Sequence, residues 1–217
     1  MKSPKGKSNL CCLPGASSSS RKVYFDEAAE TWDQRFYTPK LAAFLEGLVS
    51  RFGLKPGYDV LDVGTGTGVL IPFLLQAIGL SGSVTAIDFA ERMVQICRSK
   101  HSHLKNVAVK LHDVEEEDLP IASFDAVTCF GLFPHLKKKE KALHNLYRAL
   151  KPGGILIIAH ALSSKEVKAH HNSASPPVAN DTLPENAEMR RLLNRTGFTE
   201  IYIEDELGCY LCLSTKR

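Results

Sequence analysis

Hydrophobic positions along this chain follow two alternating patterns. Short, nearly continuous apolar runs end in glycine-rich or acidic turns, and between the runs apolar residues recur at spacings of three and four. The first pattern is typical of buried strands and the second of amphipathic helices, so the alternation predicts a parallel sheet with helices on both faces. The apolar runs are YDVLDV (58–63), SVTAID (83–88), NVAVKL (106–111), FDAVTCF (124–130) and ILIIAH (155–160).

The pattern changes after residue 184. Pro184 and Gly197 bracket one more helix, and FTEIYIEDELGCYLCLSTK (198–216) predicts two strands joined near residues 206–208, which is an antiparallel hairpin. Cys209 and Cys212 have C-x-x-C spacing. Residues three apart on a strand point to opposite faces, so we exclude a metal site there.

Composition limits the classes of protein that fit this pattern. The chain has 217 residues, 44% of them hydrophobic, and a net charge of +3. These values fit one globular domain over residues 21–217 behind a disordered tail over 1–20, with no nucleic-acid partner and no membrane span. The six cysteines form no disulfide framework, which favours a reducing cytoplasm. Cys11 and Cys12 in the tail are either a soft-metal site or two exposed thiols.

The stretch VLDVGTGTG carries the strongest chemical signal. Gly64, Gly66 and Gly68 follow a strand and precede a helix, so the backbone there can approach a ligand closely. A dinucleotide fingerprint needs its third glycine at position 69, which is valine. Asp62 before the turn suits a ligand with an ammonium group better than a pyrophosphate, which argues against a nicotinamide-dependent oxidoreductase.

Acidic residues also end the next two strands. Asp88 is either a helix cap or an acceptor for both hydroxyls of a ribose, and the glycine turn favours the ribose. Asp113 can accept a hydrogen bond from an adenine amino group, with the Val114 backbone completing the edge of the base. Ligands of open α/β sheets bind at the carboxyl ends of strands, which is where all three acids are expected.

With these motifs the chain, from about Val23 onwards, resembles the class I S-adenosylmethionine-dependent methyltransferases. It is most similar to their small-molecule branch, which includes the ubiquinone/menaquinone C-methyltransferases. The resemblance also rests on FDEAAETWD, VTAIDFAERMV, HDVEEEDLP, FDAVTCFGLFPHL and LKPGGILIIAH. It implies a Rossmann-like, doubly wound sheet of seven strands, mostly parallel, with an antiparallel strand of the C-terminal hairpin in the last-but-one position.

The resemblance implies S-adenosyl-L-methionine as the cofactor and assigns roles by motif. Asp62, Gly64, Gly66 and Gly68 would hold the methionine moiety, with Thr65 in the same turn. Asp88 would hold the ribose. The remaining cofactor residues would be Phe89 and Met93, packing on the adenine, Asp113 and Val114, reading its edge, and Phe130, near the reacting methyl group.

Four histidines are candidates for the acceptor side. His135 and His160 follow the fourth and fifth strands, and His170 and His171 follow on a helix that the capping pattern Ser163-x-x-Glu166 predicts. A neutral histidine is a suitable base near pH 7. Adjacent helical residues point about 100° apart, so at most one of the pair should face the pocket. Three interpretations stay open: a substrate-facing histidine, a solvent-exposed loop, and a metal set of His160 with His170 or His171, completed by Asp181.

Two segments are expected to enclose the acceptor. The crossover 161–184 would form a substrate-side cover, and residues 21–53 an N-terminal helical cap whose Tyr24, Phe25 and Trp32 form the other wall. Trp32 is either a packing anchor or a substrate contact. The remaining histidines, His101, His103, His112 and His144, we interpret as solvated.

The function these features favour is transfer of a methyl group from S-adenosylmethionine to a small molecule by in-line displacement, releasing S-adenosylhomocysteine. A non-catalytic sensor or scaffold that binds the same cofactor has the same motifs and stays an alternative. The acceptor, the atom methylated and the oligomeric state are open at this level.

Overall fold

The computed structural model describes residues 18–174 and 176–217, so Cys11 and Cys12 lie outside the described residues. In the described part of the chain seven strands form one sheet in the order β3-β2-β1-β4-β5-β7-β6. All neighbouring strands are parallel except β7, which is antiparallel to both β5 and β6. The strands are β1 Asp59–Val63, β2 Ser83–Asp88, β3 Val107–Leu111, β4 Phe124–Phe130, β5 Leu150–His160, β6 Phe198–Glu206 and β7 Cys209–Lys216.

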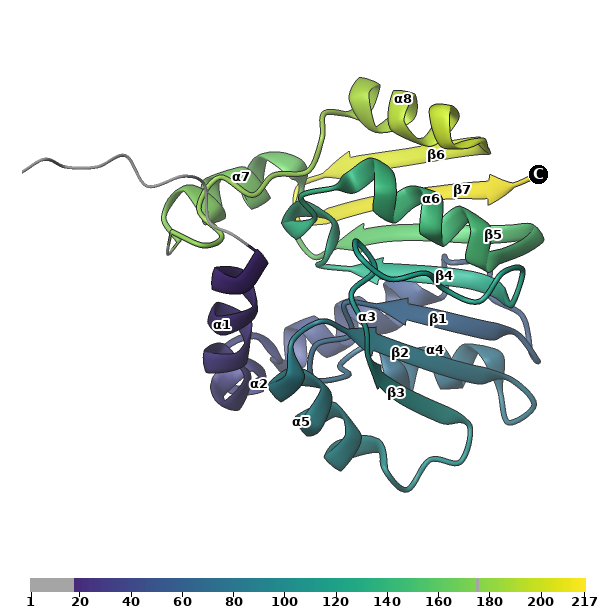
Figure 1. Ribbon diagram of the computed structural model, residues 1–217, viewed down its shortest axis with the longest axis horizontal. Coiled ribbons are helices and arrows are strands. Elements are labelled where there is room, and N and C mark those ends of the chain that lie inside the picture. Colours follow the sequence, from purple (N-terminus) through teal and green to yellow (C-terminus); the bar gives the residue numbers. More distant parts are fainter. Residues whose placement is uncertain (1–17, 175) are drawn as a thin grey trace, which may run out of the picture.

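Helices cover both faces of this sheet, as the sequence predicts (Figure 1). One face packs against α6 and α8 through residues such as Leu146 and Leu193, and the other against α3 and α4 through Leu45 and Leu74. The helices are α1 Ser18–Ala28, α2 Trp32–Phe36, α3 Pro39–Val49, α4 Ile71–Ile78, α5 Glu91–His101, α6 Lys139–Ala149, α7 Ser164–Asn172 and α8 Asn186–Thr196, with the 3-10 turns η1 Ala29–Thr31 and η2 Phe133–His135.

The fold confirms the predicted sheet and the predicted hairpin. β7 occupies the last-but-one position, and Cys209 is half-buried against one core cluster while Cys212 is buried in the other, so the two thiols lie on opposite faces. Two boundaries differ from the prediction: α1 begins at Ser18, inside the expected tail, and α8 begins at Asn186, two residues after Pro184.

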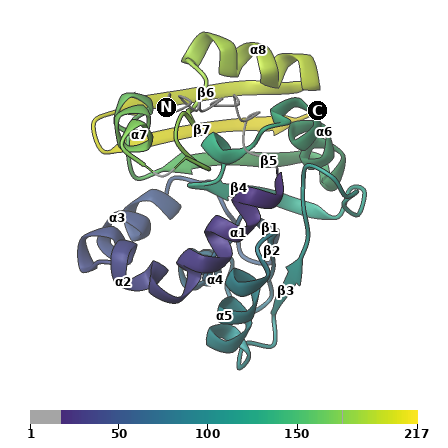
Figure 2. The ribbon, with the colours of Figure 1, turned by 60° about the vertical axis from the view of Figure 1, so that its left-hand side comes forward.

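Three helices lie beyond the carboxyl ends of the parallel strands. Figures 1 and 2 show α1 and α2 on one side of this edge and α7 on the other. The predicted capping box at Ser163 and Glu166 starts α7. None of the described helices is long and apolar enough to cross a membrane.

Candidate active site

A cavity of about 350 Å³ opens at the carboxyl ends of β1, β2, β3 and β4. This volume lies within the range of small-molecule sites. Its walls come from residues 63–64, 88–89, 112–116 and 135–138, together with Leu132 and the side chain of Arg21 from α1. Six residues singled out in the sequence line it: Gly64, Asp88, Phe89, Asp113, Val114 and His135.

The three glycines of the turn have different structural roles. All have positive φ, at +68° for Gly64, +56° for Gly66 and +85° for Gly68, where residues with a side chain are strained. A Cβ on Gly68 would lie 2.6 Å from His101 Nε2 and 2.7 Å from Cys97 Sγ, so this position must be glycine for packing. A Cβ on Gly66 would meet nothing closer than 3.9 Å, which leaves this part of the turn open to a ligand.

Asp62 lies below the turn with an unused carboxylate oxygen. Its side chain is 1% exposed, and Oδ1 accepts a hydrogen bond of 2.7 Å from Thr128 Oγ1. Oδ2 makes no hydrogen bond of standard geometry with any described residue. Burial raises the pKa of this carboxyl to about 6. A buried oxygen without a partner fits a cationic ligand group such as an ammonium.

The side chain of Asp88 links the glycine turn to the start of α5 by hydrogen bonds. Its Oδ2 accepts from the Gly66 amide and its Oδ1 from the Ala90 amide, each at 2.9 Å. Burial raises its pKa to about 6. Asp88 is not the side-chain cap of α5, whose N-cap residue is Ala90, but it links the glycine turn to that residue and also lines the cavity. A carboxylate has about four lone-pair sites, so backbone amides do not use all of them and a ligand hydroxyl can still be accepted.

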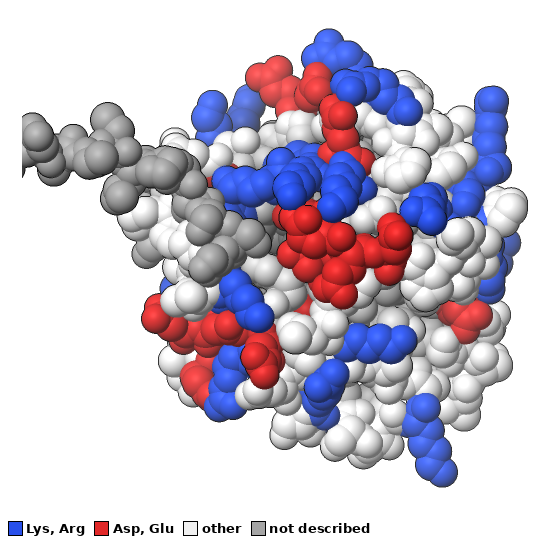
Figure 3. Space-filling model, in the orientation of Figure 1, with Lys and Arg blue, Asp and Glu red and all other residues white. Residues whose placement is uncertain are grey.

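The wall after β3 is held by a buried amide. Asn145 of α6 donates through Nδ2 to the carbonyls of Val114, at 2.9 Å, and Glu117, at 3.3 Å. Glu115 accepts from the backbone amide of Lys138, and Glu116 pairs with Lys138 and Lys141. Figure 3 shows acidic and basic side chains meeting on this face of the molecule. These contacts join the two loops that form the cavity wall.

Aromatic residues of the N-terminal cap stand behind the cavity. Phe25 contacts Phe89 and His135, with ring centroids 5.8 and 5.2 Å apart, and also meets Tyr24 and Trp32. None of Tyr24, Phe25 and Trp32 lines the cavity itself. Met93 is buried below Phe25 and Phe89.

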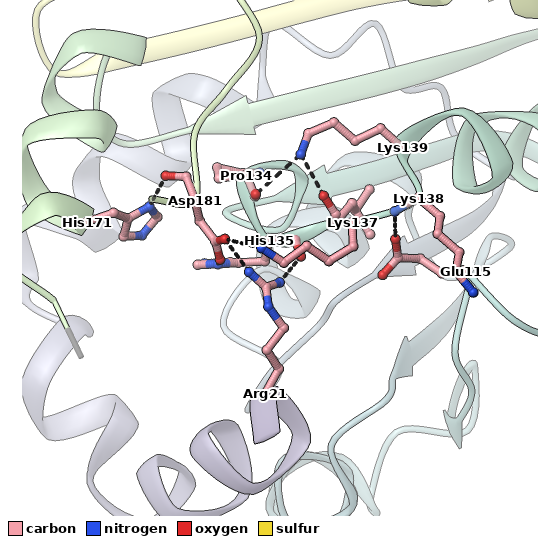
Figure 4. A network of polar contacts seen from close by, with 10 residues as sticks. Arg21, Glu115, Pro134, His135, Lys137, Lys138, Lys139, His171 and Asp181 are labelled. Atoms are coloured by element: carbon pink, nitrogen blue, oxygen red, sulfur yellow. Dashed lines mark hydrogen bonds and ion pairs between the residues drawn. The ribbon is translucent and has the colours of Figure 1, made fainter. Parts of the chain in front are cut away.

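A buried polar network lies at the other end of the cavity (Figure 4). Asp181, from the loop before α8, forms an ion pair with Arg21 and accepts from His135 Nδ1 at 2.8 Å. Arg21 also donates to the His135 carbonyl, and Lys137 lies 3.1 Å from Asp181 Oδ1. The Asp181 carbonyl accepts from His171 Nδ1 at 2.6 Å. Burial opposes a charge on Asp181, but His135 and Arg21 outweigh it and lower its pKa.

The candidate histidines occupy different surroundings. His171 is 6% exposed and its ring centroid lies 4.9 Å from that of His135, whereas His170 is exposed. His160 is half-buried beside Phe130, and burial lowers its pKa to about 3. Among residues 18–174 and 176–217, no group of three or more histidines, cysteines or carboxylates is arranged to hold a metal ion.

The prediction of solvated side chains is wrong for two histidines, which are buried or half-buried. His101 is 8% exposed and its Nε2 lies 3.1 Å from the Gly68 carbonyl. His112 is half-buried and lines the cavity. His103 and His144 are exposed, as predicted.

Arg21, Leu132 and Lys137 are the notable cavity residues that the sequence did not indicate. Leu132 lies against Gly64, since a Cβ there would be 2.7 Å from its Cδ1. An arginine in a first helical turn carries no local signal for a partner in a distant loop. The sequence indicates Asp181 only as a candidate metal ligand and gives no sign of its pairing with Arg21.

Comparisons with known proteins agree with this geometry. Residues 60–154, under half of the chain, match the family model described as a methyltransferase domain. The segment runs from β1 into β5 and contains the glycine turn and all four strand ends at which the cavity opens. In its fold and in this matched segment, the chain resembles the class I S-adenosylmethionine-dependent methyltransferases.

Within this class the similar proteins include enzymes of quinone biosynthesis. The ubiquinone/menaquinone biosynthesis C-methyltransferase UbiE of Psychromonas ingrahamii is 38% identical over 110 residues, which cover 49% of this chain and 43% of that protein. A demethylmenaquinone methyltransferase of Staphylococcus aureus is 38% identical over 106 residues, 48% of this chain and 44% of the relative. The chain therefore spans less than half the length of the curated relatives it matches.

A solved structure extends the likeness over nearly the whole chain. The S-adenosylmethionine-dependent methyltransferase from Aquifex aeolicus superposes with a TM-score of 0.68 at 27% identity, covering 90% of this chain and 98% of that chain.

Proposed function

We propose that this protein transfers the methyl group of S-adenosylmethionine to a small-molecule acceptor and releases S-adenosylhomocysteine. The observation that carries the proposal is the buried Asp62 carboxylate, whose Oδ2 has no hydrogen bond of standard geometry and which directly precedes Val63 and Gly64 in the cavity wall. An ammonium group fits that oxygen, and the acidic residue makes a pyrophosphate unsuitable. The names of the similar proteins support the same chemistry.

The roles of individual residues belong to the proposal. Asp62, Gly64, Thr65 and Gly66 would hold the methionine moiety, while Gly68 serves the packing of the turn. Asp88 would accept the ribose hydroxyls. The adenine would lie against Phe89, with Met93 beneath it, and Asp113 and Val114 at its edge. Phe130 would lie near the methyl group.

The bound cofactor supplies a methyl group already activated by its sulfonium. The work of this chain is therefore to orient the acceptor and exclude water, and such positioning can supply about 7–11 kcal/mol. The cap over residues 21–53 and the cover over 161–184 are the segments we assign to that task. The cysteines among the described residues are free, which supports a reducing, cytoplasmic setting.

Ligand binding tests this proposal directly. Trp32 is the single tryptophan of the chain, and its Nε1 lies 3.9 Å from where a Cβ on Gly66 would be. S-adenosylhomocysteine should therefore change its fluorescence and bind with a 1:1 stoichiometry by calorimetry. Asp88→Ala should weaken this binding at least tenfold. Binding of NADH in place of S-adenosylhomocysteine would refute the proposal, and tight binding without methyl transfer to any acceptor would favour the sensor alternative.

A further inference from the structure

Asp181 joins three elements that are far apart in the sequence. The residue is 2% exposed, and its carboxylate oxygens are divided between its partners. Oδ1 accepts hydrogen bonds from the cations Arg21 and Lys137, and Oδ2 accepts one from His135 Nδ1. Its backbone carbonyl receives His171 Nδ1. One residue thus contacts two imidazoles, that of His135, which lines the cavity, and that of His171 (Figure 4).

These contacts determine where each imidazole carries its proton. A carboxylate and a backbone carbonyl can only accept hydrogen bonds, so the nitrogen that faces them must be the N–H of a neutral ring. His135 and His171 are both assigned the Nδ1–H form by this argument. Each Nε2 then carries a lone pair, and His135, which lines the cavity, can present that lone pair to a ligand.

The charges around His135 favour a neutral ring that can take up a proton. Burial lowers its pKa, and Asp181 opposes this shift. Arg21 and Lys137 share the other carboxylate oxygen, His171 and His160 lie nearby, and Lys139 contacts the carbonyls of Pro134 and Leu136. In this setting an imidazolium would be stabilised by one close anion, Asp181, which already holds the ring in place.

Resting on the proposed function, we infer that Asp181 is a positioning residue that presents His135 Nε2 as the base for an acceptor carrying a weakly acidic proton. The matching class is a phenol or thiol, whose proton a neutral imidazole can accept near pH 7.

The step balances without a further reactant. The acceptor's O–H or S–H proton passes to His135 Nε2, and the electron pair left on the oxygen or sulfur forms the new bond to the methyl carbon. The pair of the broken carbon–sulfur bond stays on the cofactor sulfur, which becomes the neutral thioether of S-adenosylhomocysteine. His135 then returns its proton to water through the cavity, while Nδ1–H stays bonded to Asp181.

Nitrogen NMR of the 15N-labelled full chain tests the tautomers without any substrate. At a pH where both rings are neutral, His135 and His171 should each show a protonated Nδ1 and an unprotonated Nε2, with assignments from His135→Gln and His171→Gln. A protonated Nε2 on His135 would overturn the inference. Stoichiometric binding of Zn²⁺ by both Nε2 atoms would overturn it as well, since those lone pairs would then belong to a metal.

Asp181→Asn provides a sharper test with an internal control. Arg21 and Lys137 require an acceptor, so the new amide should turn its oxygen to them and its NH₂ to His135. His135 must then accept at Nδ1 and should change to the Nε2–H form. His171 faces the backbone carbonyl and should not change. Retention of Nδ1–H on His135 in a folded variant contradicts the positioning role.

Activity separates this inference from the proposed function. With S-adenosylhomocysteine formation as the readout, catechol and thiophenol are compared with pyridine and dimethyl sulfide, which have no dissociable proton. Asp181→Asn and His135→Gln should lower turnover of the first pair by about 10²-fold or more, with S-adenosylhomocysteine affinity within about twofold of wild type. His144→Gln, an exposed substitution, is the control.

If only pyridine or dimethyl sulfide is methylated, and Asp181→Asn does not change the rate, His135 is not a base. The proposed methyltransferase function would still stand. Bound S-adenosylhomocysteine with no turnover of any acceptor would remove the catalytic function and the base together. Should Asp181→Asn fail to fold, the wild-type tautomers still decide the positioning role.

Discussion

At the scale of single residues, Asp62 sits in surroundings that disfavour its charge. A pKa raised to about 6, from about 4, means that the protonated carboxyl stabilises the fold below pH 4. That contribution is lost as the pH rises through 6. The free protein therefore holds an unfavourable charge at neutral pH, in the place where the proposed ammonium would bind.

Asp62→Asn should separate stability from binding. Because the asparagine carries no charge, the free energy of unfolding at pH 7.5 should rise by about 1–3 kcal/mol, and the gain should shrink towards pH 4.5. Affinity for S-adenosylhomocysteine should fall at least tenfold. Denaturant unfolding at both pH values and calorimetry measure these effects.

Asp59→Asn, on the same strand, is the control. The hydrogen bond from Ser83 and the partner Lys151 lower the pKa of Asp59 despite some burial, so this change should reduce stability. Equal effects of the two substitutions at both pH values would contradict the account of Asp62.

Gly68 gives a second prediction at this scale, with a matched position to compare. Gly68→Ala should destabilise the fold by about 2–4 kcal/mol, because a Cβ would collide with His101 and Cys97 in addition to the strain of positive φ. Gly153→Ala also falls at a positive φ, of +76°, but a Cβ there would meet nothing within 4 Å. Thermal or denaturant unfolding of both variants should show Gly68→Ala as clearly the worse; similar losses would mean that backbone strain alone explains the glycine.

At the scale of elements, α7 is tied to the β6–β7 turn by its capping residues. Glu166 accepts from Ser163 N at 2.8 Å and from Gly208 N at 2.7 Å, and Asp205 accepts from Ser164 N at 2.8 Å. The capping box that the sequence predicts as a helix start is therefore also the attachment of the cover segment to the sheet.

Glu166→Ala should loosen this attachment. The loss of a capping partner and of the Gly208 contact should lower the free energy of unfolding. Hydrogen exchange should quicken in α7 and at residues 207–208, with S-adenosylhomocysteine affinity unchanged and acceptor turnover reduced. Ser173→Ala, at the exposed far end of α7, should change stability by less than about 0.5 kcal/mol. Unaltered exchange in α7 would show that other contacts hold it.

The elements could be predicted from sequence where their signals are local. Apolar runs indicate five of the strands, and Asp62 and Asp88 could be placed because they lie within the last two residues of β1 and β2. The prediction that His101 is solvated is wrong because a histidine in a polar helix has the same local pattern whether it is exposed or buried. The space for its ring exists only because Gly68, 33 residues earlier, lacks a side chain. Arg21 meets Asp181 across 160 residues, which no local pattern encodes.

At the scale of the whole molecule, Arg21 connects the first helix to the last crossover. Its side chain is 4% exposed and paired with the 1% exposed carboxylate of Asp181. Arg21→Ala should cost about 3 kcal/mol, because it removes one of the charges that compensate a buried carboxylate. Amides of α1 should also exchange faster.

Arg92→Ala is the matched control for Arg21. Its ion pair with Glu30 also links the cap to the sheet domain, but both side chains are about half exposed. Such pairs contribute about 1 kcal/mol or less. A loss for Arg92→Ala as large as that for Arg21→Ala would show that burial does not distinguish the two.

The position of β7 has a consequence for how the molecule is made. β7 pairs with β5 from Ile155↔Thr215 to His160↔Tyr210 and separates it from β6. Residue 160 is synthesised well before residue 209. Until β7 has been synthesised, the nascent chain therefore exposes an unpaired edge of β5. The hairpin turn that anchors α7 is also delivered late. The acceptor side of the cavity is thus assembled only when translation has passed the final strand, whereas the glycine turn can form earlier.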